Sequence, residues 1–480
     1  MEPRTFHQAI KHTCWQHAMQ QEFQALMRNN TWSFVPCPTN ANIVGCKWIF
    51  KIKRRVDGSI EHHKARLVAQ GFKQEAGIDY FDTFSPVIKP TTIRLVLSVA
   101  LSHGWCRRQL DINNAFLNGD LTEIVYMQQP RGFEDKSNPS HVCRLHNAIY
   151  GLKQAPRAWF NKLKSYLIQH GFKACRSDTS LFVHYSSNSI IYILVYVDDL
   201  ILTGTNAAHI QSFITKLHVV FALKDLGSLH YFLGLQIHRT STGLTLSQEN
   251  YIHDILCRSK MSEASSISTP ADPGSRLHSE GAPSEDPKLF RRVVGSLQYV
   301  TITHPDITYA VNRVCQFMHS PTTLHWQATK RILRYLKGTS THCLHFKPTQ
   351  AQSLLAYSDA GWLSDPKDSR SQYSTESEYR SLAYTAAELI WIQQLLTDLY
   401  MPLIRPPLLL CDNVGAIFMT KNPVIQTRSK HIALDFHFIR ELVESNSLHV
   451  RHISSVDQMA DIFTKALSKD RIFQLRSKLQ

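Results

Sequence analysis

An apolar run interrupted by two aspartates constrains the fold of this chain more than any other stretch. Residues Ile190–Gly204 read IIYILVYVDDLILTG, with Val, Ile, Tyr and Leu on both sides of Asp198 and Asp199. β-Branched and aromatic residues in two short runs predict a strand–turn–strand hairpin, and Gly204 marks the end of its second strand. The chain is therefore expected to hold two adjacent carboxylates at the tip of a buried hairpin.

The hairpin alone leaves two interpretations of this Asp pair open. Asp is common in β-turns, so the pair fits an ordinary turn. Carboxylates held at a strand end also suit Mg²⁺, a hard cation that takes oxygen ligands. A third carboxylate at the same place would favour the metal site. Asp111 is the candidate, because it ends a short expected strand, Leu110–Ile112, and precedes Asp198 by 87 residues, enough for an intervening helix and strand.

Composition bounds the class of protein. The chain has 480 residues, 43% of them hydrophobic and 19% charged, which predicts two or three globular domains rather than disorder. The net charge of +15 favours a polyanionic partner, although a solvated basic surface gives the same number. The ten cysteines form no CxxC pair, which argues against zinc ribbons and disulfides and suits a reducing, intracellular compartment. No 18-residue apolar run or signal-peptide pattern is found, so no membrane partner is expected.

The N-terminal side alternates basic and apolar residues. The expected elements are a helix, a pair of strands and a later helix, Thr5–Asn29, Trp32–Val35, Gly45–Arg54 and Thr91–His103. Trp48 and Phe50 share one face of the second strand, and Val56–Ser59 reads as a hairpin turn. Lys and Arg recur between Lys47 and Lys73, either as a solvated edge or as a surface for phosphates.

A composition change separates the later part of the chain. Met261–Lys288 is rich in Ser, Pro, Ala and Gly, so it is expected to be an exposed tether. Helices are expected at Leu289–Met318 and at Thr322–Lys337, the second ending at Gly338. The second helix has an outward basic face made of Lys330, Arg331, Arg334 and Lys337. A solvated face is the default for such charges, and a surface following a nucleic-acid duplex is the alternative.

Several strings, in order, carry a family resemblance. LDINNAFLNGDL, YGLKQAPRAWF, YVDDL and LKDLGSLHYFLGLQI resemble the palm motifs of copia-type retrotransposon reverse transcriptases. CKWIFKIKRRVDG and KARLVAQGFKQEAGIDYFDTFSPV resemble the fingers of that family, and RRVVGSLQYVTITHPDITYAVNRVCQFMHS resembles the segment after its polymerase domain. The likeness runs over nearly the whole chain. It implies an α+β and α/β architecture: a right-hand polymerase with fingers, palm and a thumb-like part, then an RNase H-like α/β domain.

The resemblance also divides the chain. Its expected parts are a helical lead-in at 1–30, fingers and palm at 31–260, a linker at 261–288, a helical thumb-like or connection-like segment at 289–345 and an RNase H-like domain at 350–470.

The resemblance implies an RNA-directed DNA polymerase. Two Mg²⁺ ions, with Mn²⁺ as an alternative, would be held by Asp111 and Asp198, with Asp199 as helper. The implied partners are an RNA template, a DNA primer and deoxynucleoside triphosphates, and the implied location is a cytoplasmic virus-like particle or the nucleus. The residues assigned to substrate are Lys64, Arg66, Phe116, Gly151, Lys153, Pro156, Tyr196, Leu233 and Gly234.

These substrate residues have separate roles. Lys64 and Arg66 suit triphosphate oxygens, since Arg offers a bidentate fork and Lys a point charge. Phe116 matches the aromatic that blocks a ribose 2′-hydroxyl in the family, with core packing as the alternative. Gly151, Lys153 and Pro156 match a turn that faces template and nucleotide, and Leu233-Gly234 matches a hairpin that positions the primer end.

The C-terminal region matches the RNase H carboxylates at Asp359, Glu378, Asp412 and Asp461, a set used for two-metal hydrolysis of RNA in a hybrid. Only 19 steps separate Asp359 from Glu378. That length does not accommodate the two strands and flanking pieces that the family has there. A hairpin of about 25 residues is therefore expected to be lost, with the cleavage activity. Glu378 also fits a capping box with Thr375.

Rival functions from other classes remain. No nucleocapsid, protease or integrase part is recognised in the 480 residues, so a catalytically silent nucleic-acid-binding remnant is the alternative. A metal-dependent phosphohydrolase is disfavoured because it leaves the fingers and Phe116 unexplained. All three palm carboxylates remain in their motif contexts, which favours the polymerase.

Overall fold

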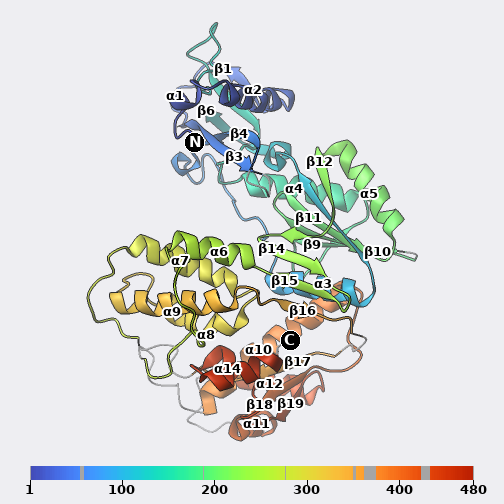
Figure 1. The fold of residues 1–480 in the computed structure, drawn as a ribbon. Coiled ribbons are helices and arrows are strands. Elements are labelled where there is room, and N and C mark those ends of the chain that lie inside the picture. Colours follow the sequence, from blue (N-terminus) through green and yellow to red (C-terminus); the bar gives the residue numbers. More distant parts are fainter. Residues whose placement is uncertain are drawn as a thin grey trace. The chain divides into compact units, whose positions relative to one another are not determined.

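The computed structural model describes residues 2–54, 59–187, 189–275, 277–349, 353–361, 375–422 and 433–478. The chain forms two compact units. The first contains Met1–Ile93 and Trp105–Ser228, and the second contains Arg94–Gly104 and Leu229–Gln480 (Figure 1).

A mainly antiparallel six-stranded sheet is the centre of the first unit, with strand order β12-β5-β11-β10-β9-β8. Its strands are β5 (Cys106–Ile112), β8 (Lys173–Ala174), β9 (Leu181–Ser186), β10 (Ser189–Tyr196), β11 (Asp199–Gly204) and β12 (Leu223–Ser228). Helices α4 (Ala155–Gln169) and α5 (Ala207–Val220) pack on one face, where Leu110, Leu163 and Leu217 are fully buried. The other face of β5 and β11 carries Asp111, Gln109, Asp199 and Thr203, together with the buried Ile201.

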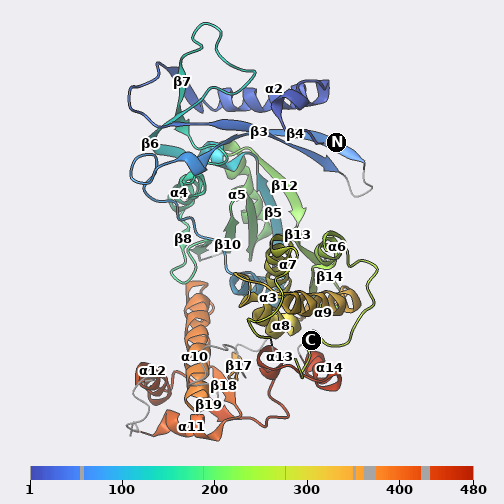
Figure 2. The ribbon, with the colours of Figure 1, turned by 90° about the vertical axis from the view of Figure 1, so that its left-hand side faces the viewer.

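The rest of the first unit contains a second sheet and a two-stranded ribbon. The sheet has the order β1-β7-β6-β2, with β1 (Trp32–Val35), β2 (Ile43–Val44), β6 (Asp120–Met127) and β7 (Val142–Asn147). The ribbon pairs β3 (Cys46–Arg54) with β4 (Ile60–Ala69), and α2 (Thr13–Arg28) lies along it (Figure 2). The short helices are α1 (Phe6–Ala9), η1 (Gly71–Lys73) and η2 (Ala115–Asn118).

The structure tests three sequence predictions about this part of the chain. Trp48 and Phe50 are buried on one face of β3, as the alternation predicted. The continuous helix at Thr5–Asn29 is wrong, because the chain turns between α1 and α2. The two strands do not pair with each other, since β1 pairs with β7 and β3 with β4. Most of the predicted turn at Val56–Ser59 lies outside the described residues.

The second unit begins with a sheet and a helical core. The sheet order is β13-β14-β15-β16, with β13 (Tyr231–Phe232), β14 (Leu235–Arg239), β15 (Leu244–Ser247) and β16 (Leu344–Phe346). The helices are α6 (Glu249–Arg258), α7 (Pro287–Val300), η3 (Pro305–Ile307), α8 (Thr308–Cys315) and α9 (Thr323–Thr339). A single helix at Leu289–Met318 is therefore wrong: Pro305 cannot continue α7 because it lacks a backbone N–H. Helix α3 (Pro90–Ser102), which was predicted, spans the boundary between the units.

The segment before α7 is not an exposed tether. The side chain of Arg334 donates to the Ser265 carbonyl oxygen at 2.8 Å, and Arg331 donates to the Thr269 hydroxyl at 2.8 Å. Leu277 is 8% exposed and packs in the helical core. Composition alone misses such packing because the contacts are made by polar side chains.

The C-terminal part of the second unit has a three-stranded parallel sheet. Its order is β17-β18-β19, with β17 (Leu355–Ser358), β18 (Leu408–Cys411) and β19 (His449–His452). The helices are α10 (Thr375–Asp398), α11 (Val414–Lys421), α12 (Ala433–Glu444), α13 (Asp461–Thr464) and α14 (Lys469–Lys478) (Figure 2). Residues 362–374, on which the predicted loss of a hairpin depends, lie outside the described residues. Among the described helices, none has both the length and the apolar character of a membrane span.

Candidate active site

The Asp198–Asp199 hairpin has the predicted form. Strands β10 and β11 pair from Ile191↔Gly204 to Tyr196↔Asp199, so Val197 and Asp198 make a two-residue turn. Val197 has φ +52°, a left-handed conformation that is rare for a β-branched residue. The turn is held from outside: the indole of Trp159 donates to the Val197 carbonyl at 2.6 Å, and the Ile112 N–H donates to the Asp198 carbonyl at 2.8 Å. The surrounding structure thus stabilises a strained turn.

Asp111 joins the hairpin through the sheet. It lies directly opposite Asp199 in the antiparallel β5–β11 ladder. Directly opposed residues point to the same face, which here is the face away from α4 and α5. The sequence prediction that the strands of Asp111 and of the hairpin lie side by side is confirmed. The structure therefore gathers three carboxylates at one end of the sheet.

Burial and neighbouring negative charges disfavour ionisation of Asp198 and Asp199. Burial raises the pKa of Asp198 above its ordinary value, and the negative charge of Asp111 adds to the rise. Burial, followed by the charges of Asp198 and Asp111, raises the pKa of Asp199 to about 6, against a hydrogen bond from Gln109. Like charges opposed across a ladder are destabilising, so this arrangement favours a bound cation.

A cationic and aromatic cluster lies in the same unit. The guanidinium carbon of Arg66 is 4.1 Å from the centroid of the Tyr150 ring, and the Phe116 ring meets that ring edge-on at 4.8 Å. Arg66 and Lys64 are two residues apart on β4, and both lower the pKa of Asp198. Burial lowers the pKa of Lys64 itself, and the adjacent charge of Arg66 adds to that effect. Arg66 and Phe116 therefore both contact the Tyr150 ring, and Lys64 lies two residues from Arg66 on the same strand.

The turn before α4, predicted to face template and nucleotide, makes close contacts within the chain. Gly151 has φ +92°, and a Cβ there would lie 2.2 Å from the Ala69 carbonyl oxygen. Its glycine is thus explained by close packing against β4. The ammonium of Lys153 donates to the Tyr80 hydroxyl at 3.0 Å and to the Gln74 carbonyl at 3.3 Å. Pro156 occupies the first turn of α4, where no backbone donor is needed.

The remaining predicted residues lie at strand ends. Tyr196 is the last residue of β10 and is partly buried. Leu233 and Gly234 form the turn between β13 and β14, both with positive φ, so the predicted hairpin is present. The Tyr299 hydroxyl donates to the Leu233 carbonyl oxygen and holds this turn against α7.

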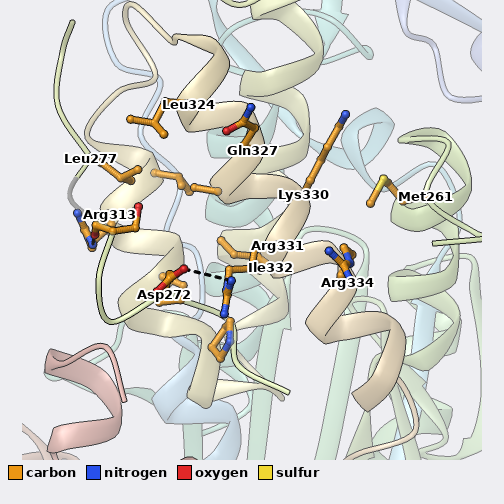
Figure 3. Close-up of a pocket in the computed structure, with 16 residues that line it drawn as sticks. Met261, Asp272, Leu277, Arg313, Leu324, Gln327, Lys330, Arg331, Ile332 and Arg334 are labelled. Carbon is orange, nitrogen blue, oxygen red and sulfur yellow. Dashed lines mark hydrogen bonds and ion pairs between the residues drawn. The ribbon is translucent and has the colours of Figure 1, made fainter. Parts of the chain in front are cut away.

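The basic face of α9 lines a pocket of about 430 Å³ (Figure 3). Arg331 forms an ion pair with Asp272 at 3.5 Å, and Arg334 bonds to Ser265. Lys330 is exposed, and its ammonium is 5.7 Å from the Trp326 ring centroid. The two arginines therefore hold the Met261–Leu277 segment rather than forming a wholly solvated face.

Four carboxylates converge at the C-terminal sheet. Asp359 and Asp412 directly follow β17 and β18, Glu378 lies on α10 and Asp461 begins α13. Burial, with the charges of Asp359 and Asp412, raises the pKa of Glu378 to about 7. The Glu378 carboxylate accepts a hydrogen bond from the Ala360 N–H at 3.1 Å, so it faces this cluster. The predicted set is thus brought together.

Comparison with known proteins identifies the family. Residues 29–273, more than half of the chain, match the family model described as reverse transcriptase (RNA-dependent DNA polymerase). The chain belongs to this reverse transcriptase family. The resemblance to copia-type retrotransposon enzymes is confirmed, and the first unit has a polymerase-like α+β fold.

Three relatives illustrate the extent of the match. The chain is 49% identical to the retrovirus-related Pol polyprotein from transposon RE1 of Arabidopsis thaliana over 504 residues, covering 100% of this chain and 34% of the relative. It is 50% identical to the retrovirus-related Pol polyprotein from transposon RE2 of the same plant, and the match covers 98% of this chain and 34% of the relative. It is 36% identical to the retrovirus-related Pol polyprotein from transposon TNT 1-94 of Nicotiana tabacum, and the match covers 100% of this chain and 39% of the relative. The chain thus spans about a third of the length of these relatives.

Both carboxylate groups of this chain fit a divalent cation by their donor chemistry. The palm group offers only carboxylate oxygens, which Mg²⁺ prefers. In the C-terminal group, ligand atoms of Glu378, Cys411 and Asp412 lie within 4.8 Å of one another. Burial raises the pKa of the Cys411 thiol to about 12, and the two carboxylates of this group offer the oxygen atoms that Mg²⁺ prefers.

Sequence reasoning missed several residues of these sites. Trp159 and Tyr150 act through tertiary contacts that no local pattern encodes. Lys465 bridges Asp359 and Asp461, at 3.1 Å and 2.6 Å. One signal for Lys465 was readable: it follows Asp461 by four residues, the spacing of a helical ion pair.

Proposed function

We propose that the chain is an RNA-directed DNA polymerase that extends a DNA primer on an RNA template. The opposition of Asp111 and Asp199, with Asp198 in the adjoining turn, carries the proposal. In the reaction, the primer 3′-oxygen forms a bond to the α-phosphorus of a deoxynucleoside triphosphate, and pyrophosphate leaves. Two bound Mg²⁺ ions, held mainly by Asp111 and Asp198, would activate the hydroxyl and neutralise the leaving group.

The side chains supply binding and orientation. The strained turn fixes the direction of the Asp198 carboxylate, because the backbone carbonyl groups of Val197 and Asp198 both accept hydrogen bonds from outside the turn. Arg66 and Lys64 provide positive charge for triphosphate oxygens. Phe116, edge-on to Tyr150, forms a wall that excludes a 2′-hydroxyl. The cytoplasm, within a virus-like particle, or the nucleus is the proposed location.

Primer extension tests the proposal. The wild-type chain with Mg²⁺, an RNA template and a labelled DNA primer should produce extended products, and Asp198→Asn should abolish them. Asp120→Asn is the matched control, because Asp120 is an exposed Asp of the same unit that pairs only with Lys162 at 2.7 Å. Unchanged extension by Asp198→Asn contradicts the metal assignment. Tight template–primer binding without extension by the wild type supports the silent remnant instead.

We further propose that RNA cleavage by the C-terminal region is lost. The described residues give β17 one neighbouring strand, β18. The match to the transposon RE1 relative runs over 504 positions although this chain has 480 residues, so at least 24 positions have no counterpart here. A labelled RNA–DNA hybrid should therefore stay intact with the wild-type chain. Cleavage that Asp412→Asn abolishes would overturn this part of the proposal.

A further inference from the structure

Lys465 lies between two of the C-terminal carboxylates. It follows α13 directly, and its ammonium is 3.1 Å from Asp359 Oδ1 and 2.6 Å from Asp461 Oδ1. The Lys465 side chain is 30% exposed, whereas those of Asp359 and Asp461 are 1% and 11% exposed. A cation is thus in contact with two carboxylates that solvent barely reaches.

The other oxygens of this pair also have donors. Asp359 Oδ2 accepts a hydrogen bond from the Thr464 hydroxyl. Asp461 Oδ2 accepts one from Arg471 at 3.1 Å. All four carboxylate oxygens of the pair are therefore engaged by groups of the chain itself. Each oxygen keeps a second lone pair, so what opposes a divalent cation here is the positive charge of Lys465, at 3.1 Å and 2.6 Å from the two carboxylates, and of Arg471 beside Asp461.

The second half of the cluster is different. Glu378 and Asp412 have ligand atoms within 4.8 Å of each other, and their hydrogen bonds come from uncharged groups: Ala360 N–H, Ser455 and Gln458. Burial and the neighbouring negative charges disfavour ionisation of Glu378. The positive charge of Lys465 thus serves the Asp359–Asp461 half and leaves the Glu378–Asp412 half without an equally close cation among the described residues.

We propose that Lys465 is an internal counter-ion that occupies the Asp359–Asp461 half of the cluster and closes it to divalent cations. The Glu378–Asp412 half remains the place where an added cation binds. Lys465 is a positioning residue: it stabilises two buried carboxylates at the cost of their capacity to hold metal. This proposal does not depend on polymerase activity, because it concerns only the second unit.

The physical reason is that an unpaired buried charge raises the free energy of the folded state. Without Lys465, the Asp359 carboxylate keeps one neutral donor among the described residues, the Thr464 hydroxyl, in a site with 1% side-chain exposure. An ionised carboxylate in such a place is strongly destabilising unless a cation replaces the lost one. A divalent cation binding the folded form restores stability through mass action.

Mn²⁺ counting tests the proposal in the full chain. Electron paramagnetic resonance of free Mn²⁺ should show about one more bound ion per chain for Lys465→Met than for the wild type. The palm carboxylates are identical in both proteins, so the difference reports on this cluster. Lys469→Met is the matched control, since Lys469 is an exposed lysine four residues away, and it should bind as the wild type does.

Thermal unfolding with and without Mn²⁺ gives a second readout. It distinguishes the proposed role of Lys465 from that of an ordinary salt bridge, whose loss Mn²⁺ would not compensate. In EDTA, Lys465→Met should unfold about 5–10 °C below the wild type, and saturating Mn²⁺ should remove most of that difference. Lys465→Gln keeps a hydrogen-bond donor without the charge, and serves if the Met variant fails to fold. Equal Mn²⁺ binding in all folded variants, or an equal loss of stability with and without Mn²⁺, overturns the proposal.

Discussion

Asp199 lies directly opposite Asp111 across the β5–β11 ladder, so two carboxylates share one face of the sheet at the end where the Val197–Asp198 turn begins. Cross-strand pairs usually stabilise a sheet through complementary side chains, and like charges have the opposite effect. The palm sheet is therefore assembled against a local electrostatic cost. Such costs are typical of functional sites, where a ligand supplies the compensation.

Asp199→Asn should stabilise the metal-free protein while lowering primer extension. The pKa of Asp199 is raised from 3.8 to about 6, so its ionisation costs folded-state stability, and that cost is complete above pH 6. In EDTA at pH 8 the variant should gain about 0.5–1 kcal/mol in the free energy of unfolding. At pH 5, where the wild-type carboxyl is largely protonated, the gain should be smaller. Urea unfolding at pH 5 and at pH 8 measures this gain in the free energy of unfolding.

The control for this prediction is Asp120→Asn. Asp120 is exposed and pairs with Lys162, so removing its charge relieves no repulsion. A gain of the same size in Asp120→Asn, or a gain in Asp199→Asn that is equal at pH 5 and pH 8, would show that repulsion at the palm is not the cause.

Arg66→Lys should weaken nucleotide binding more than primer binding. The substitution keeps the charge but loses the planar fork and the contact with the Tyr150 ring at 4.1 Å. We expect KM for the deoxynucleoside triphosphate to rise about tenfold, with primer–template affinity unchanged. Steady-state extension and filter binding measure the two quantities. Arg144→Lys, an exposed position on β7, is the control and should change neither. A parallel loss of primer binding would place Arg66 on the template backbone instead.

Phe116→Ala should relax discrimination against ribonucleotides. Phe116 is partly buried and touches the Tyr150 ring edge-on, which leaves a ring surface to block a 2′-hydroxyl. The ratio of kcat/KM for deoxynucleotide over ribonucleotide should fall about 10- to 100-fold, the range of a single steric contact. Phe116→Tyr retains the ring and should keep the ratio. If Phe116→Ala loses stability while the ratio stays unchanged, the residue serves core packing alone.

Local patterns in the sequence were sufficient for the palm carboxylates but not for their surroundings. The Ile190–Gly204 hairpin and the strand of Asp111 follow from β-branched runs and turn residues over a few positions. The contact between Arg66, Tyr150 and Phe116 joins three separate segments, so no local period encodes it. The family resemblance predicted roles for Arg66 and Phe116, but it did not predict which residues they contact.

One wrong prediction, the exposed tether, has its physical origin in polar tertiary contacts. The segment at Met261–Lys288 lacks large apolar residues, yet arginines of α9 hold it through hydrogen bonds and an ion pair. Long cationic side chains reach several partners, so their targets depend on the folded arrangement.

Val197→Gly should stabilise the protein and reduce primer extension. Val197 has φ +52° at the first position of a two-residue hairpin turn, where glycine is preferred. Trp159 and Ile112 hold the turn in this conformation through their hydrogen bonds to the Val197 and Asp198 carbonyl groups. Glycine removes the Cβ clash, so we expect a gain of about 1 kcal/mol in unfolding free energy. It also lets the turn sample other conformations, which should lower kcat several-fold by loosening Asp198. Val197→Ala separates strain from side-chain size: alanine retains the Cβ and should gain little stability. Equal stabilisation by glycine and alanine would show that the turn stores no backbone strain, and unchanged kcat in Val197→Gly would show that its rigidity does not serve catalysis.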